Sequence, residues 1–465
     1  MPELQQLQTE LPQNIFRAYD IRGVADTQLN ESNIELIGKA LAANALESGE
    51  QTLLLGADAR VSSSKLKRAL LKGILSTGCN VIDLGTVPTP LLYFAAYTSA
   101  YGSGLMLTAS HNPAQYNGIK VLHKRSCLSP EQIQGIRVRA LKGDFPEGQG
   151  SVSERDFSDE YIQRVKKDVR LAKRLRIVVD CANAVPSTLA PKLFEALGCE
   201  VFKLHCSLDG TFPNHPPDPT VQENLQELIE EVKNRKADLG VALDGDGDRV
   251  VLVTEKGNVI DTDRLLMLLI KDIAPKYQNP NIVFDVKCST LLRQLIINEG
   301  GNPVMSRSGH SFMKQMMHDK DAVIGAEFSA HVFIKDRWFG YDDGPYAAAR
   351  FLEILSKSKQ SADMMLKDLP QSIVTPELRI EVSDERKFQL MERIKALAHF
   401  PQGQVNDIDG VRVDFEDGWG LVRASNTTPA LLLRFEARSR QALLAIQALF
   451  RDLLREVDAK LELSF

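Results

Sequence analysis

The stretch Leu239-Gly-Val-Ala-Leu-Asp-Gly-Asp-Gly-Asp-Arg249 joins a short apolar run to a loop with three acidic residues. A run of this kind, bounded by turn residues, is typical of a buried strand in a parallel sheet. The carboxylates of Asp244, Asp246 and Asp248 alternate with glycines and repel one another, so a bare solvated loop is a costly arrangement. A hard divalent cation removes the repulsion, and ligands that are all oxygen indicate Mg²⁺. We therefore predict a magnesium site directly after a strand.

Two other interpretations of this acidic loop are a surface turn and a calcium-binding EF-hand. An EF-hand needs glycine directly after its third acidic residue and a glutamate further on, whereas Arg249 follows Asp248 here. Mg²⁺ keeps coordination positions open for phosphate oxygens. The loop therefore indicates phosphoryl chemistry more than structural metal binding.

An apolar run followed at once by a polar loop occurs three times along the chain. In each stretch, short apolar runs alternate with helical patterns, which is the signature of βαβ units. The expected strands are 53–56, 81–84 and 104–107, then 176–179, 201–204 and 239–243, then 282–284, 303–305 and 322–324. The last run of each stretch leads into the polar loops 108–113, 244–249 and 327–331. Ligands bind beyond the carboxyl ends of strands in open α/β sheets, so these loops predict one central cleft.

The pattern changes at about residue 370. A strand at 377–382, a helix, several strands between 411 and 435 and a closing amphipathic helix follow. An apolar stripe on the closing helix predicts a core face, with a groove for a partner as the alternative. We predict an α/β protein with three similar mixed α/β domains, at 1–155, 156–256 and 257–369, and a smaller C-terminal α+β domain at 370–465, around a central cleft.

Composition excludes several classes of protein. The 465 residues carry 56 Lys and Arg against 61 Asp and Glu, a net charge of −5, so there is no basic field for nucleic acid or an anionic membrane. The six cysteines form no C-x-x-C pair, which favours reduced thiols over a zinc site or a disulfide framework. The first 14 residues are polar, without the apolar segment of a signal peptide. We expect a cytoplasmic protein.

Ser110, in Thr108-Ala-Ser-His-Asn-Pro113, is the candidate nucleophile. Its flanking residues do not form the G-x-S-x-G turn of a serine hydrolase. Neighbouring side chains seldom face each other, which favours His111 as a residue that structures the loop over a base for Ser110. Taken alone, Ser110 is a turn hydroxyl and Lys120 is equally an ordinary surface lysine. Because a predicted Mg²⁺ loop stands at the matching position of the next domain, a phosphorylated serine that ligates the metal becomes the sharper interpretation.

Seven segments carry a resemblance to a known family, the α-D-phosphohexomutases, and within them the bacterial phosphomannomutase/phosphoglucomutase group. They stand in order across nearly the whole chain: Phe16-Arg-Ala-Tyr-Asp-Ile-Arg-Gly23, Thr108–Pro113, Asp209-Gly-Thr-Phe-Pro-Asn-His215, Asp244–Arg249, Arg307-Ser-Gly-His310, Glu327–His331 with Arg337-Trp-Phe-Gly340, and Arg423-Ala-Ser-Asn-Thr427.

The resemblance implies a reaction centre. Ser110 would carry the phosphoryl group, and its phosphate oxygen would hold Mg²⁺ together with Asp244, Asp246 and Asp248. Four further residues would surround the transferring group and neutralise its oxygens or move a proton: Arg22, Lys120, Arg249 and His310. Which of them is the general acid or base stays open.

The resemblance also implies groups that bind the sugar phosphate. Glu327 and Ser329 would bind hydroxyls, His331 follows them in the family pattern, and Tyr19 would pack near the sugar or be structural. The distal phosphate would be bound by Arg423, Ser425, Asn426 and Thr427. Hydroxyls, an amide and a guanidinium suit a phosphate dianion, which needs several donors and one fixed cation.

The chain departs from the family pattern in three places. The segment Cys181-Ala-Asn-Ala-Val-Pro-Ser187 replaces a glycine-rich turn, and Ser308 replaces a threonine. The sugar loop has Phe328 and Ala330 where methionine and glycine are usual. If residue 330 needs a positive φ, alanine costs about 1 kcal/mol there. We expect these departures to change the affinity for the substrate rather than the reaction.

The implied reaction interconverts hexose 1-phosphate and hexose 6-phosphate, of mannose, glucose or both, in a monomer or weak dimer. A hexose 1,6-bisphosphate is the intermediate, and glucose 1,6-bisphosphate would act as the activator. The alternatives are a phosphoglucosamine mutase, an Mg²⁺-dependent sugar-phosphate phosphatase with an aspartate of the acidic loop as nucleophile, and a non-catalytic sugar-phosphate sensor.

Overall fold

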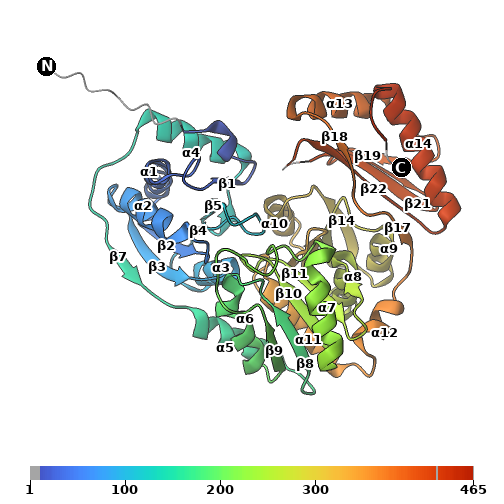
Figure 1. Ribbon diagram of the computed structural model, residues 1–465, viewed down its shortest axis with the longest axis horizontal. Coiled ribbons are helices and arrows are strands. Elements are labelled where there is room, and N and C mark those ends of the chain that lie inside the picture. Colours follow the sequence, from blue (N-terminus) through green and yellow to red (C-terminus); the bar gives the residue numbers. More distant parts are fainter. Residues whose placement is uncertain (1–10, 426–427, 464) are drawn as a thin grey trace. The chain divides into compact units, whose positions relative to one another are not determined.

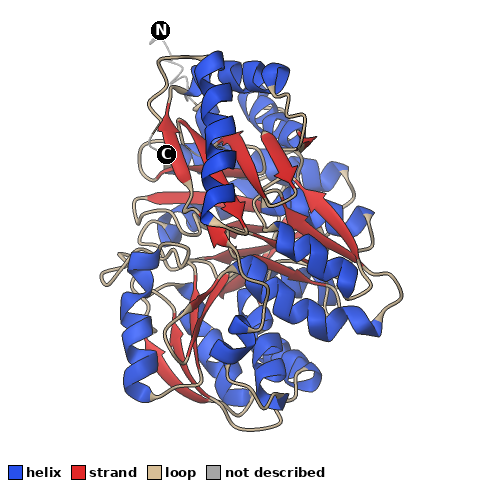
Figure 2. Cartoon of the chain, turned by 90° about the vertical axis from the view of Figure 1, so that its right-hand side faces the viewer, coloured by secondary structure: helices blue, strands red, loops and turns tan. Residues whose placement is uncertain are grey.

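The computed structural model describes residues 11–425, 428–463 and 465, which divide into two compact units. Unit 1 comprises the chain up to Asp261 together with Ser329–Asp363. Unit 2 comprises Thr262–Phe328 and the chain from Met364 onward. The described residues form four β-sheets with helices between their strands (Figures 1 and 2).

The first sheet of unit 1 runs in the order β1-β5-β4-β2-β3-β7, with β6 paired to β5. Its strands are β1 (Asp20–Val24), β2 (Thr52–Ala57), β3 (Asn80–Thr86), β4 (Gly104–Leu107), β5 (Tyr116–His123), β6 (Ser126–Cys127) and β7 (Val152–Glu154). Strand β5 is antiparallel to β1 and to β4, whereas β2, β3, β4 and β7 are parallel. The sheet therefore carries an antiparallel edge that the βαβ pattern did not predict.

Helices cover both faces of this sheet. Side chains that alternate along β2 face different helices: Leu53 and Leu55 lie in one core cluster with residues of α1 (Glu31–Glu47), α2 (Ser63–Leu75) and α4 (Pro130–Lys142). Helix α3 (Thr89–Thr98) packs against β2 and β4 from the other side. Local signals set the helix ends, since Ser129 and Gln132 form a capping box before α4 and Gly143 ends it at φ 68°.

The second sheet of unit 1 has the order β12-β11-β10-β8-β9. Its strands are β8 (Arg176–Asp180), β9 (Glu200–Leu204), β10 (Leu239–Leu243), β11 (Val250–Thr254) and β12 (Val259–Ile260). Every residue of β10 and β11 is buried, because helices pack on them: α7 (Gln226–Arg235) and α11 (Gly344–Lys357). Unit 1 also contains α5 (Ser158–Asp168), α6 (Ala190–Ala196) and β16 (His331–Ile334). The acidic loop joins β10 to β11 as a tight connection.

In unit 2 the strands β14 (Asn302–Ser306), β13 (Asn281–Asp285) and β15 (Ile324–Glu327) are parallel neighbours. The helices of this part are α8 (Thr262–Ile273), α9 (Thr290–Asn298) and α10 (His310–Asp319). The strand predicted at 322–324 is displaced toward the carboxyl end. Ala322 closes the turn after α10 instead, since its N–H donates to the carbonyl of Met317 at 2.9 Å.

The last sheet is antiparallel, in the order β17-β22-β21-β20-β19, with β18 also paired to β22. Its strands are β17 (Ile373–Val374), β18 (Leu378–Glu381), β19 (Gln404–Asn406), β20 (Val411–Phe415), β21 (Gly418–Ala424) and β22 (Ala430–Ala437). Helix α13 (Asp384–Leu397) lies between β18 and β19 in the chain, α14 (Arg440–Val457) follows β22, and the short α12 (Ala362–Lys367) precedes the sheet. The apolar stripe of α14 lies in the core cluster with residues of the sheet, so the predicted core face is confirmed.

The predicted fold class is therefore confirmed: three mixed α/β parts and a smaller C-terminal α+β part. The bounds of the four domains and the central cleft stay predictions. None of the helices in the described ranges has the length and apolarity needed to cross a membrane. All six cysteines are free thiols.

Candidate active site

The loops after β4 and β10 meet, so that Ser110 lies against the acidic loop. The Ser110 hydroxyl donates to Asp244 Oδ2 at 2.6 Å, and both side chains are buried. Lys120, from β5, places Nζ 2.6 Å from Asp246 Oδ2 and also contacts Asp248 Oδ2. Residues from two different sheets thus form one centre, as the rule on strand ends predicts.

The acidic residues have the geometry and the electrostatics of a cation site. Each of Asp244, Asp246 and Asp248 offers one oxygen within 4.8 Å of the others. Among the described residues, Oδ1 of Asp246 and of Asp248 is buried without a hydrogen-bond partner. Burial and the two neighbouring carboxylates raise the pKa of Asp244 well above its usual value. These residues fit a hard divalent cation, which would take up the unpartnered oxygens and offset the repulsion.

Lys120 stays charged although it is buried. Desolvation opposes its charge, but the carboxylates of Asp246 and Asp248 outweigh this and hold its pKa well above the usual value. The same contact holds the pKa of Asp246 below its usual range against the effect of burial. The site therefore contains a permanent ammonium group beside the carboxylates.

Arg22 reaches the same edge of the sheet through the pairing of β1 with β5. In that register Arg22 lies opposite Gly118, and Asp20 lies opposite Lys120. The Arg22 guanidinium donates to Asp20 Oδ2 at 2.5 Å and to the side-chain carbonyl of Asn112 at 2.6 Å. Tyr19 is half-buried just before β1. Arg22 is therefore a second fixed cation, bound to the loop that carries Ser110.

Arg249 and His331 form a third contact with the acidic loop. Arg249 Nε donates to His331 Nε2 at 3.0 Å. On the other side of the ring, His331 Nδ1 lies 3.0 Å from Asp342 Oδ2 and 3.5 Å from Asp248 Oδ1. The carboxylates favour the proton on Nδ1, which leaves the Nε2 lone pair for the arginine. His331, predicted only to follow Glu327 and Ser329 in the family pattern, thus lies directly against the acidic loop.

His111 does face Ser110, contrary to the expectation from their adjacency. Its Nδ1 lies 3.3 Å from the Ser110 hydroxyl. Ser110 has a φ of 50°, so the backbone lacks the extended geometry that separates neighbouring side chains. Desolvation, followed by the charges of Arg249 and Arg22, lowers the pKa of His111 well below its usual value. The imidazole is therefore neutral beside the hydroxyl.

The other predicted residues lie in unit 2, except Ser329. His310 is the first residue of α10 and Glu327 is the last of β15; both are buried. Arg423, in β21, forms an ion pair with Asp409 at 3.0 Å. Ser425, which follows β21 directly, is buried. Asn426 and Thr427 lie outside the described residues. Ser329, in unit 1, has a buried hydroxyl.

Two aspartates that the sequence analysis missed connect the predicted segments of unit 2. Asp285, at the end of β13, accepts from the Ser308 hydroxyl at 2.8 Å and from the Phe328 N–H at 3.2 Å. Asp409 accepts from the Ser308 N–H at 2.9 Å and pairs with Arg423. The 307–310 segment is therefore bound both to the sugar loop and to the loop at 423.

Four residues of unit 1 that contact the predicted site were missed as well: Asp58, Arg60, Thr89 and Asp342. Thr89 donates its hydroxyl to Asp246, and Asp58 follows directly after β2. Asp58 directly follows β2 and Asp285 is the last residue of β13, so a position at the carboxyl end of a strand could have indicated both residues. No sequence pattern marks Arg60, Thr89 or Asp342, because their partners are far away in the chain.

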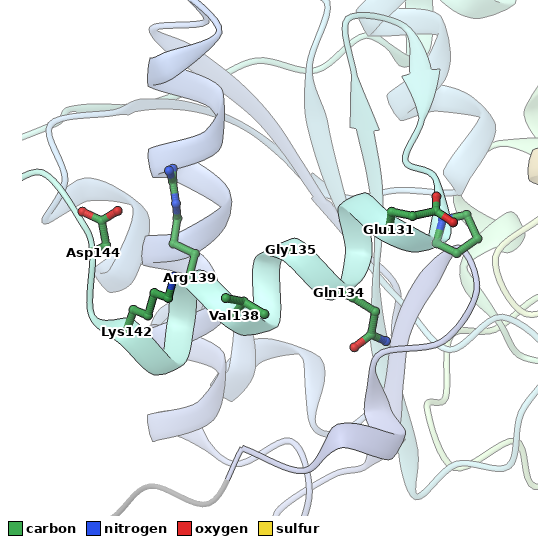
Figure 3. Close-up of a pocket in the computed structure, with 8 residues that line it drawn as sticks. Glu131, Gln134, Gly135, Val138, Arg139, Lys142 and Asp144 are labelled. Carbon is green, nitrogen blue, oxygen red and sulfur yellow. The ribbon is translucent and has the colours of Figure 1, made fainter.

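An open hollow of ≈650 Å³ lies on α4 and the turn after it, away from these residues (Figure 3). Both acidic and basic side chains line it: Glu131, Arg139, Lys142 and Asp144. Arg139 already pairs with Glu47 at 2.5 Å. The hollow has no concentrated charge for a phosphate, so we place the site at the strand ends.

A hydroxyl, three carboxylates suited to a divalent cation, and fixed cations around them define a class: an enzyme of phosphoryl transfer. Four family models match in order along the chain. They describe phosphoglucomutase/phosphomannomutase alpha/beta/alpha domain I at residues 13–147, domain II at 159–257, domain III at 261–373 and the C-terminal domain at 377–453. The chain belongs to the phosphoglucomutase/phosphomannomutase family.

Individual proteins agree with this family. The chain is 48% identical to a phosphomannomutase/phosphoglucomutase of Pseudomonas putida over 98% of each chain. It is 44% identical to a phosphoglucomutase of Neisseria gonorrhoeae over 96% of this chain and 97% of that one. A crystal structure of a phosphoglucomutase/phosphomannomutase family protein from Burkholderia thailandensis matches with a TM-score of 0.94 and 40% identity, over 98% of this chain and 100% of that one. The resemblance is confirmed, and the chain is an intramolecular phosphotransferase, an isomerase.

Proposed function

We propose that the protein interconverts the 1-phosphate and the 6-phosphate of a hexose, mannose or glucose or both, through a phosphorylated Ser110. The observation that carries the proposal is the Ser110 hydroxyl, 2.6 Å from Asp244 in a cluster with unpartnered carboxylate oxygens. Close relatives named phosphomannomutase/phosphoglucomutase support the substrate class.

In the proposed reaction the phosphoserine P–Oγ bond breaks while a hydroxyl of the sugar phosphate forms a new P–O bond, and the proton that this hydroxyl loses ends on the Ser110 oxygen. The product is a hexose 1,6-bisphosphate, and the reverse step with its other phosphate restores the phosphoserine. Glucose 1,6-bisphosphate would load a dephosphorylated enzyme in the same way. Residues Asp244, Asp246 and Asp248 would hold Mg²⁺, which lowers the cost of the negative charge on the transferred group.

The fixed cations have a defined role in this proposal. Lys120 and Arg22 would neutralise phosphoryl oxygens without reorganisation, because carboxylates already hold them in place. Arg249, locked against His331, would do the same from the other side of the acidic loop. His310 is proposed to act with them on the phosphoryl group or the hydroxyl proton.

The remaining predicted residues would supply recognition. Arg423 and Ser425, with Asn426 and Thr427, are proposed to bind the phosphate that does not react. Glu327, together with Ser329 and His331, would accept sugar hydroxyls in both orientations of the bisphosphate. Tyr19 would pack near the sugar. Because one reaction centre serves both ends of the sugar, this recognition must tolerate either phosphate.

The test is the intact mass of the purified protein, followed by Mg²⁺-dependent conversion of glucose 1-phosphate and mannose 1-phosphate with a trace of bisphosphate. We compare the native chain with Ser110→Ala and with Ser153→Ala, an exposed serine of β7. A phosphate adduct that only Ser110→Ala lacks, with turnover lost in the same variant, supports the mutase. Phosphate release with full activity in Ser110→Ala would identify a phosphatase, and preferential turnover of glucosamine phosphate would identify a phosphoglucosamine mutase.

The location and the oligomeric state remain predictions from the sequence. We expect the protein in the cytoplasmic fraction of its cells, and a mass of one chain or a weak dimer in light scattering after size exclusion.

A further inference from the structure

The backbone of Ser110 lies in a conformation that L-residues rarely adopt, with a φ of 50°. Its peptide groups are held on both sides. The Ser110 N–H donates to the Thr108 hydroxyl at 2.9 Å, and the Ser110 carbonyl accepts from Arg60 Nη2 at 2.7 Å. Such a conformation persists only where its surroundings impose it, so these contacts are the first candidates for what orients Ser110.

Arg60 binds the whole loop and not only Ser110. Its Nη2 donates to the carbonyl of Asn112 at 2.7 Å, and its Nη1 donates to those of Pro113 at 2.7 Å and Tyr116 at 3.1 Å. The guanidinium is fully buried, with 0% of the side chain exposed. Four separate carbonyls need the several N–H donors of the planar arginine fork, which the single ammonium of lysine cannot replace.

Asp58 orients both groups that hold Ser110. Its Oδ2 accepts from Arg60 Nε at 3.0 Å and from the Thr108 hydroxyl at 2.7 Å. Its Oδ1 accepts from the Ser63 hydroxyl at 2.6 Å and from the Arg60 N–H at 3.1 Å. Because Asp58 follows β2 directly, the position of the Ser110 peptide is set by the central strands of the sheet.

The segment 209–215, a family motif to which the proposed reaction gives no role, covers Arg60. The Phe212 ring centroid lies 5.1 Å from the guanidinium carbon, and Gly210 forms a parallel bridge to Arg60. On the remaining side, a Cβ atom at Gly245 would lie 2.1 Å from the Ser110 carbonyl oxygen, so the metal loop leaves this oxygen no space to move. Arg60 is thus held between the loop that carries Ser110 and the segment 209–215.

We infer that Arg60, oriented by Asp58 and covered by Phe212, is a positioning residue that holds the Ser110 peptide so that its hydroxyl faces the metal carboxylates. The inference rests on the proposed function, in which Ser110 carries the phosphoryl group. Arg60 touches neither substrate nor metal in this assignment. It acts through the carbonyls of the loop.

The test compares Arg60→Lys and Phe212→Leu with Arg68→Lys, an exposed arginine of α2. Turnover is measured per phosphorylated enzyme, alongside KM and melting temperature. We expect Arg60→Lys to lower kcat by about 100-fold with little change in KM, since a misplacement of about 1 Å costs that much. Phe212→Leu, which keeps the charge but removes the ring, should lower kcat by about 10-fold on the same reasoning. Arg68→Lys should match the native chain.

A rescue experiment separates positioning from stability. In Arg60→Ala, added guanidinium ion should restore part of the lost kcat, whereas Ser110→Ala should not respond. A lower melting temperature with native kcat per phosphorylated enzyme, in Arg60→Lys and Phe212→Leu alike, would overturn the inference. If Arg60→Ala does not fold, the kcat of Phe212→Leu distinguishes positioning from stability: a lowered kcat supports the inference and a native kcat overturns it. Absence of phosphoserine and of mutase turnover in the native chain would instead contradict the proposed function.

Discussion

Ala330 has a φ of 76°, the left-handed conformation that glycine adopts without strain. From the sequence we expect alanine to be costly at residue 330 if the sugar loop needs a positive φ there. The structure has this positive φ. Ala182 and Asn183, in the segment that replaces the glycine-rich turn of the family pattern, also have positive φ values, of 48° and 58°. The chain therefore retains glycine-type backbone at these positions and tolerates the strain of a Cβ atom there.

Replacing Ala330 by glycine should be neutral or should stabilise the protein by up to about 1 kcal/mol, since the strain is relieved while one buried methyl is lost. The matched control is Ala242→Gly, in the same core cluster but within strand β10. That change relieves no backbone strain and should lower the free energy of unfolding by about 1 kcal/mol or more. Denaturant unfolding of both variants measures the difference, and equal destabilisation would contradict the argument.

Asp343 is a second residue with a clear consequence, because burial raises its pKa to about 7. Its carboxyl accepts from the Tyr161 hydroxyl at 2.8 Å and from the Tyr346 N–H at 2.9 Å. The folded state therefore binds a proton that the unfolded state has released above about pH 4. Its stabilising contribution is full below that pH and is lost as pH rises to about 7.

Asp343→Asn should remove this dependence. Between about pH 5 and 7 the free energy of unfolding of the native chain should fall relative to the variant by about 1.4 kcal/mol per pH unit, and the difference should level off above that range. Urea titrations at several pH values measure it. The exposed Asp417→Asn should show a constant difference from the native chain, and a constant difference for Asp343→Asn would disprove the assigned titration.

At the scale of the element, α14 depends on one apolar stripe. Phe450 is fully buried, and its ring contacts those of Phe400 and Phe435 with centroids 5.3 Å away in each case. Leu449, one position earlier, is 44% exposed. A helix of this kind is held by its packed face more than by its intrinsic propensity.

Phe450→Ala should therefore cost about 3–5 kcal/mol of stability, whereas Leu449→Ala should cost about 0.5 kcal/mol or less. Calorimetry or denaturant unfolding distinguishes the two variants. Similar losses for both would mean that α14 does not depend on this face.

At the scale of the molecule, the two units hold different parts of the predicted site. Ser110, Lys120 and the three metal carboxylates all belong to unit 1, whereas Arg423 and Glu327 belong to unit 2. In the proposed assignment, metal binding would therefore need only contacts inside unit 1. Recognition of the sugar phosphate would also use Arg423 and Glu327, which unit 1 does not contain.

This division predicts that two substitutions affect different quantities, the Mg²⁺ affinity and the KM for the sugar phosphate. Asp246→Asn should weaken Mg²⁺ binding at least about 10-fold, because a first ligand is lost. Arg423→Ala should leave Mg²⁺ affinity unchanged and should raise KM for the sugar phosphate about 10-fold or more through loss of a charge-assisted contact. Isothermal titration and steady-state kinetics measure these, with exposed Arg438→Ala as the control for unit 2. A loss of Mg²⁺ affinity in Arg423→Ala would contradict the division.

The sequence by itself determined the βαβ order, the acidic loop and its cation chemistry, because these depend on local spacing: alternation of apolar runs, and three carboxylates within five positions. The motifs that resemble a family then located Arg22, Lys120 and the unit 2 residues. Only the tertiary structure decided how Ser110 is held, since Arg60 acts on carbonyls 50 to 56 positions away. Only the tertiary structure revealed, likewise, the antiparallel β1–β5 edge and the contacts of Asp342 and Asp285. Contacts between distant segments leave no periodic mark in a single sequence, because they depend on packing and not on spacing.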